Sequence, residues 1–171
     1  MAPARTILTG QTLVAEGNPL RDGPQAMRHD ADGAVLIEDG RIAAVGAAAA
    51  LTAAHHDARR LDHGEHLILP GFVDAHAHYP QTGIIASWGK RLIDWLNTYT
   101  FPEEARFDDP AYAAAVAGRY LDLLLAHGTT SVASYCTIHP GSVDALFEAA
   151  AARGMAIWAG KTCMDRNAPD S

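Results

Sequence analysis

The feature that most constrains the fold is an alternation of strand-like and helix-like segments in the second part of the chain. Three short apolar or β-branched segments, 72–78, 129–137 and 155–162, are separated by helical segments at 109–128 and 141–153. Strands that alternate with helices indicate a parallel sheet with right-handed crossovers. Residues 71–171 are therefore predicted to be α/β.

Both helical segments carry the expected end signals. Asp109 is a predicted N-cap with Pro110 at the first helical position, and Gly128 and Gly154 follow the two segments as terminators. The apolar spacing predicts the residues that face inward. They are Tyr112, Val116, Tyr120 and Leu123 in the first helix, and Val143, Leu146, Phe147 and Ala150 in the second.

Residues 1–70 have a different sequence pattern, with short strand-like runs separated by turns. Thr6–Val14 is β-prone, and Val35–Gly46 is predicted to be a hairpin in which Asp39-Gly40 supplies a two-residue turn. Gly17–Gly33 is predicted to be a polar loop, and Ala47–Ala54 one or two helical turns. His55, His56, His63 and His66 fall in a polar segment that is expected to be solvated surface.

Composition excludes several classes of partner. The 171 residues carry a formal net charge of −7, which disfavours nucleic acid or an anionic membrane as the main partner. Two cysteines are too few for a disulfide framework, and the N-terminus lacks the apolar segment of a signal peptide. We therefore expect a cytoplasmic protein.

The segment that carries chemistry is LILPGFVDAHAHYPQ, Leu67–Gln81. Side chains two apart on a strand share a face, so Asp74, His76 and His78 are predicted to point the same way. Two imidazoles at the end of a strand suit zinc or iron. A bare HxH pair is weak evidence, but one that ends an apolar strand after PGFVD is stronger. Asp74 could support the metal site or hold the strand by backbone hydrogen bonds.

These residues resemble a known family. PGFVDAHAH is similar to the first-strand signature of the amidohydrolase superfamily, in which a small β-sandwich flanks a metal-bearing (β/α)₈ barrel. Further stretches narrow the resemblance to its guanine deaminase branch: HAHYPQ, LIDWLNTYTFPEEARF, HGTTS, TIHPGSVDALFEAA and MDRNAPD. The resemblance implies that residues 1–70 are the N-terminal portion of the β-sandwich. Residues 71–171 are then the first three β/α units of an incomplete (β/α)₈ barrel, a fold that takes about 250 residues.

The resemblance also implies site residues and a reaction. It makes His76 and His78 metal ligands for one zinc ion, with iron possible, and Gln81 a substrate contact for the purine. Zinc would activate water for attack on the amine-bearing carbon of guanine, and a carboxylate would move protons to the leaving ammonia, giving xanthine. The other ligands and the proton shuttle are expected beyond Ser171. The 171-residue chain is thus expected to be truncated and inactive by itself, and the complete protein to be a homodimer.

Two alternatives remain open. The chain could belong to another aminohydrolase of the superfamily, acting on a different base or resembling a chlorohydrolase. It could also be a truncated product that acts only by interaction. His139 is expected to help start the helix that follows it rather than touch substrate. The aromatic residues of 88–101 are expected to pack a loop over the barrel mouth or to form a subunit interface.

Overall fold

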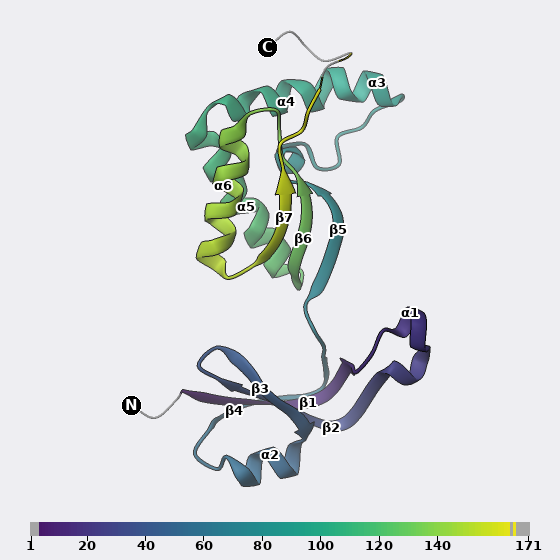
Figure 1. Ribbon diagram of the computed structural model, residues 1–171, viewed down its shortest axis with the longest axis vertical. Coiled ribbons are helices and arrows are strands. Elements are labelled where there is room, and N and C mark those ends of the chain that lie inside the picture. The colour runs from purple at the N-terminus through teal and green to yellow at the C-terminus, as the bar shows by residue number, and fades with distance from the viewer. Residues whose placement is uncertain (1–3, 165, 167–171) are drawn as a thin grey trace. The chain divides into compact units, whose positions relative to one another are not determined.

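The computed structural model describes residues 4–164 and residue 166, and it divides the chain into two compact units, residues 1–70 and 71–171 (Figure 1). Most of the MDRNAPD motif, Met164–Asp170, lies outside the described residues. No helix among the described residues is long and apolar enough to cross a membrane.

The first unit is a four-stranded sheet in the order β3-β2-β1-β4. Strand β1 pairs antiparallel with β2 and parallel with β4, and β2 pairs antiparallel with β3. Helix α2 packs on the sheet, where its Ala48 and Leu51 join Ile7 and Leu36 in a small core. The elements are β1 (Arg5–Ala15), α1 (Pro19–Asp22), η1 (Pro24–Ala26), β2 (Met27–Glu38), β3 (Arg41–Ala47), α2 (Ala48–Ala54) and β4 (Arg59–Ile68).

The predicted hairpin turn is confirmed. Asp39 and Gly40 join β2 to β3 with φ values of 50° and 77°. Both central residues of a two-residue hairpin turn need positive φ, which glycine adopts without strain and aspartate tolerates better than most residues. The Asp-Gly pair therefore fixes the register of the two strands, and Glu38 pairs with Arg41 across the turn.

One expectation for this unit is wrong. The stretch Gly17–Gly33 is not a loop throughout, because β2 begins at Met27 and pairs with β1 from Ala15 onward. The polar segment ahead of residue 70 contains a further strand, β4. The side chains of His63 and His66 on β4 are nevertheless exposed, as expected.

The second unit contains a parallel sheet in the order β5-β6-β7, which confirms the prediction from the strand–helix alternation. Helices α5 and α6 pack together and cover one face of this sheet (Figure 1). The elements are β5 (Phe72–His78), η2 (Tyr79–Ile84), α3 (Leu92–Trp95), η3 (Leu96–Thr100), α4 (Phe101–Ala105), η4 (Arg106–Asp108), α5 (Pro110–Ala126), β6 (Thr129–Tyr135), α6 (Pro140–Arg153) and β7 (Ala156–Gly160).

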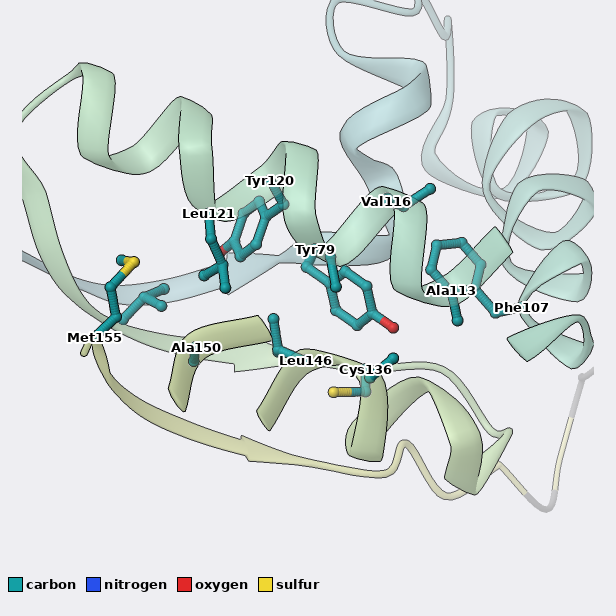
Figure 2. Packing of buried hydrophobic residues seen from close by; sticks show 13 residues of the cluster. Tyr79, Phe107, Ala113, Val116, Tyr120, Leu121, Cys136, Leu146, Ala150 and Met155 are labelled. Atoms are coloured by element: carbon teal, nitrogen blue, oxygen red, sulfur yellow. The ribbon is translucent and has the colours of Figure 1, made fainter. Parts of the chain in front are cut away.

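The core of this unit is centred on Tyr79, the first residue after β5 (Figure 2). Its ring meets Phe107 edge-on at a centroid distance of 5.3 Å. Its hydroxyl donates to the carbonyl of Ser142 at 2.7 Å, and its backbone N–H donates to Ser134 Oγ at 3.1 Å. These bonds fix the start of the segment that follows β5 against β6 and α6.

The helix ends follow the sequence signals. Asp109 caps α5, with its side chain accepting from the Ala111 N–H at 2.9 Å and Pro110 at the first helical position. The predicted inward faces are partly wrong. Leu146 and Ala150 are buried, but Phe147 is 43% exposed, and Leu123 is also exposed.

The segment LIDWLNTYTFPEE is helical rather than a loop. It runs through α3, a π-helical turn at Leu96–Thr100 and α4. The Phe101 N–H donates to the Leu96 carbonyl, five residues back. Pro102 has no N–H with which to continue the ordinary helical ladder, which gives the wider turn a local cause.

Candidate metal and base-binding site

The candidate site begins at an irregularity in β5. Asp74 pairs with Val132 and Ala77 with Ser134, so three steps along β5 match two along β6. An opposite irregularity lies between Phe72 and Val73, where one step on β5 matches two on β6. The two irregularities cancel, and the strand ends stay in register.

Asp74 stabilises the backbone at this bulge. Its Oδ1 accepts the backbone N–H of His76 at 3.0 Å, within the stretch of β5 where the register shifts. The structure thus confirms that the carboxylate holds the strand, and its support of the metal site stays a prediction.

The imidazoles of His76 and His78 lie side by side at the carboxyl end of β5. Their ring centroids are 5.3 Å apart with a tilt of 54°. Tyr135, the last residue of β6, packs on both: it stacks on His78 at 4.7 Å and lies 5.4 Å from His76. The sheet thus brings two nitrogen donors together and supports them with a ring from the neighbouring strand.

The local environment favours the metal-binding form of His78. Burial, and to a smaller extent the nearby His76, lower the pKa of this imidazole below its ordinary value. A lowered pKa favours the neutral ring near pH 7, and only a neutral ring offers a lone pair to a cation. Desolvation therefore prepares the ring for a ligand role.

Gln81 lies three residues beyond His78, in η2, and faces the same cavity of about 620 Å³. Its Nε2 donates to Glu104 Oε1 at 3.3 Å. Burial raises the pKa of the Glu104 carboxyl, and the hydrogen bond from Gln81 opposes that shift. The structure thus brings Gln81 to the cavity of both histidines.

An apolar wall completes the cavity. Ile84, Ile85 and Trp95 line it, and the Trp95 Nε1 donates to Ser87 Oγ at 2.8 Å. A cavity with a flat aromatic wall and a few polar groups suits a small planar ligand. The helical segment expected to lie over the mouth therefore contributes one residue, Trp95, to the wall.

The described residues supply only part of a metal site. No group of three or more His, Cys, Asp or Glu side chains that could hold a metal ion occurs within residues 4–164 and 166. Two imidazoles fit zinc, which takes four ligands in most protein sites. The pair is therefore a chemically suitable half-site.

Other candidates have plainer roles. His139 is the N-cap residue of α6, its carbonyl accepting from the Ser142 N–H at 3.0 Å, so the expectation that it starts the helix is confirmed.

Sequence reasoning missed Glu104 and Tyr135. Tyr135 ends the strand that neighbours the histidines, a position from which its role could have been inferred. Glu104 is 23 residues from Gln81 and carries no local signal.

Comparison with known families matches the whole of the second unit. The model of the "Amidohydrolase family" matches residues 67–171. A second model, "Imidazolonepropionase-like composite domain, bacteria", matches residues 33–58 in the first unit.

Individual relatives are similar over most of this chain. Guanine deaminase of Escherichia coli is 44% identical over 146 residues, which are 85% of this chain and 33% of that protein. A solved structure of E. coli guanine deaminase covers 96% of this chain and 39% of its own, with a TM-score of 0.84. The guanine deaminase of C. acetobutylicum, solved with guanine bound in the active site, is 33% identical, covers 97% of this chain and 38% of its own, and has a TM-score of 0.79.

A more distant structure shares the fold. Atrazine chlorohydrolase TrzN of Arthrobacter aurescens, solved in complex with zinc, is 23% identical with a TM-score of 0.70, covering 91% of this chain and 35% of its own. The chain spans about a third of the length of the curated relatives it matches.

Proposed function

Because the chain belongs to the amidohydrolase family, we propose that it provides the first part of a metal-dependent hydrolase that converts guanine to xanthine and ammonia. Strands β5, β6 and β7 are then the first three strands of a (β/α)₈ barrel, and residues 1–70 are part of a flanking β-sandwich. The 44% identity to E. coli guanine deaminase supports this assignment.

The observation that carries the proposal is the pair of imidazoles at the end of β5. His76 and His78 lie 5.3 Å apart between ring centroids, and both border the cavity that Gln81 faces. Catalytic groups of such barrels lie at the carboxyl ends of the strands. We assign His76 and His78 as ligands of one zinc ion on this geometry, with the remaining ligands on other parts of the complete protein.

Zinc would supply the Lewis acidity that makes water a nucleophile at neutral pH. The residues of this chain would bind the zinc ion and orient its ligands. Burial lowers the pKa of His78, which favours the neutral ring that a metal needs. Tyr135 limits rotation of both imidazoles by packing on them.

Gln81 and the apolar wall would hold the base. A purine is flat, and Trp95 offers a flat surface whose indole nitrogen is already bonded to Ser87. The Gln81 amide can hydrogen-bond a base edge. Water then adds at the amine-bearing carbon, the C–N bond breaks, and the amine leaves as ammonia after taking up protons, so that guanine and water give xanthine and ammonia.

The same proposal extends to assembly and location. We propose a homodimer on the family resemblance and a cytoplasmic location on the two cysteines, both of which are free thiols. The net charge of −7 supports a small-molecule substrate over nucleic acid or an anionic membrane.

The test uses the complete protein that contains this segment. His76→Ala and His78→Ala should each lose bound zinc and guanine turnover, whereas His56→Ala, which changes an exposed histidine of the first unit, should retain both. Zinc content by mass spectrometry and ammonia release from guanine, adenine and cytosine are the measurements.

The outcomes separate the candidate functions. Turnover of guanine with zinc bound supports the proposal. Turnover of another base, or dehalogenation instead of deamination, would retain the metal site and reject the substrate. Full zinc content in both histidine variants would reject the metal site itself.

A further inference from the structure

The amide of Gln81 is held in one of two orientations by the partly buried carboxyl group of Glu104. Gln81 Nε2 donates to Glu104 Oε1 at 3.3 Å, and both side chains are partly buried. A Glu104 oxygen accepts this hydrogen bond, and the amide nitrogen of Gln81 therefore faces Glu104. The amide oxygen of Gln81 is then the atom left for a ligand in the cavity.

The residue that holds the amide sits on a fixed element. Next to Glu104, the buried Glu103 accepts from the Tyr112 hydroxyl and from Arg106 Nη1, the latter at 2.9 Å. The Arg106 guanidinium lies 3.9 Å from the centre of the Tyr112 ring. These three contacts link α4, η4 and the start of α5, so that the backbone of Glu104 belongs to a packed group of short helices.

The segment that carries Gln81 packs closely on the same element. A Cβ added at Gly83 would come within 2.7 Å of Glu103 Oε1, so the backbone of η2 approaches the carboxylate as closely as glycine allows. Gln81 and Glu104 therefore belong to two segments in direct contact. Their hydrogen bond depends on this packing rather than on two mobile surface side chains.

We propose that Glu104 is a positioning residue that fixes the Gln81 amide with its oxygen toward the bound base, so that the site selects a base presenting an N–H there. The inference rests on the proposed function and deepens it. Guanine carries N–H groups at N1 and on its 2-amino group, where adenine has an unprotonated N1 and a C–H. A Gln81 amide oxygen that is fixed toward the base can accept a hydrogen bond from these N–H groups of guanine. At the same positions adenine offers it no N–H donor.

The test compares variants of the complete, zinc-loaded protein. Glu104→Gln keeps an oxygen that can accept from Gln81, and the KM for guanine should stay within about threefold of the wild-type value. Glu104→Leu has no acceptor and frees the amide. We expect KM and the Kd for guanine to rise about tenfold, with kcat changed less than about threefold, because one hydrogen bond that orders the ligand contact is lost.

A double variant separates positioning from a general structural effect. If Glu104 acts through Gln81, Gln81→Leu with Glu104→Leu should bind guanine no more weakly than Gln81→Leu alone. Zinc content and melting temperature check the fold. If Glu104→Leu loses zinc, Glu104→Met, which keeps an unbranched side chain, takes its place.

Each other outcome overturns the inference. Additive losses in the double variant, a Glu104→Gln variant as impaired as Glu104→Leu, or a Glu104→Leu variant with unchanged KM would each remove Glu104 from this role. If the wild-type protein binds and deaminates guanine and the Gln81→Leu variant does so equally well, the inference is rejected and the proposed function is not. A wild-type protein that neither binds nor deaminates guanine rejects the proposed function, and the inference with it.

Discussion

Asp74 and Glu104 both support residues proposed to bind metal and substrate, but they do so through different atoms. Asp74 accepts a backbone N–H and holds the path of β5, whereas Glu104 accepts a side-chain N–H and holds an amide orientation. A change at Asp74 should therefore act on metal binding, and a change at Glu104 on the base.

Asp74→Ala in the complete protein should weaken zinc binding about tenfold, because a partner that orients a ligand residue is lost. Asp74→Asn keeps an acceptor oxygen and should stay within a few-fold of the wild type. Zinc affinity measured by competition with a chelator tests this. Glu148→Ala, at an exposed position of α6, is the control. Equal affinities in Asp74→Ala and the control would contradict the prediction.

The two cysteines should differ sharply in reactivity. Burial raises the pKa of Cys136 to about 11, and its side chain is only 2% exposed, whereas Cys163 is exposed. The thiolate is the reactive form, and a raised pKa keeps Cys136 protonated until the pH nears 11. Iodoacetamide at pH 8 should modify Cys163 and spare Cys136. Peptide mass spectrometry reads the sites, and equal labelling of both would refute the burial of Cys136.

Single residues also show what the sequence could predict. The strand period predicts that His76 and His78 share a face, because that relation is local. The contact between Gln81 and Glu104 depends on packing of η2 against α4, which no spacing rule gives. The metal and substrate roles of His76, His78 and Gln81 stay predictions until the variants are measured.

At the level of elements, the stretch from β5 into η2 carries all three proposed site residues, and its packing depends on glycine at one point. Gly83→Ala would bring Cβ within 2.7 Å of Glu103 Oε1 and should destabilise the protein by about 1–3 kcal/mol. Nothing lies within 4 Å of a Cβ added at Gly141, in α6. Gly141→Ala should be neutral or stabilising by up to about 1 kcal/mol. Urea unfolding of both variants gives the comparison, and an equal loss in both would contradict it.

Elements with strong local signals were predicted well, and those held by distant pairing were not. Strand β5 was predicted with its observed ends, because an apolar run follows Pro70-Gly71. Strand β4 was missed: its residues are mostly polar and exposed, and it pairs with β1 more than 50 residues earlier, as in Thr6 with Arg59. Neither composition nor alternation marks such a strand.

For the molecule as a whole, the sheet of the second unit presents apolar side chains without cover from the described residues. Val73 and Trp158 are 67% and 63% exposed, and β5 and β7 each have one hydrogen-bonded neighbour among the described strands. Open strand edges and apolar patches favour association.

The 171-residue chain produced alone should therefore associate or unfold without a sharp transition, and should release no ammonia from guanine. Light scattering, thermal unfolding by circular dichroism and an ammonia assay test this. The complete protein, prepared in parallel, is the control. A monomer with a cooperative transition would contradict the first expectation, and guanine turnover would contradict the second.

The paired irregularities of β5 and β6 also determine where a single-residue deletion in β5 would keep its pairing with β6. The extra step on β6 near Thr130 is offset by the extra step on β5 between Asp74 and Ala77. A one-residue deletion at Ala75 would be absorbed in the bulge and leave Ala77 opposite Ser134. The same deletion at Val73 would turn the preceding side chain to the other face. A deletion at Ala75 should thus preserve the pairing of β5 with β6 better than one at Val73, although it also removes the two-residue span over which Asp74 holds the His76 N–H.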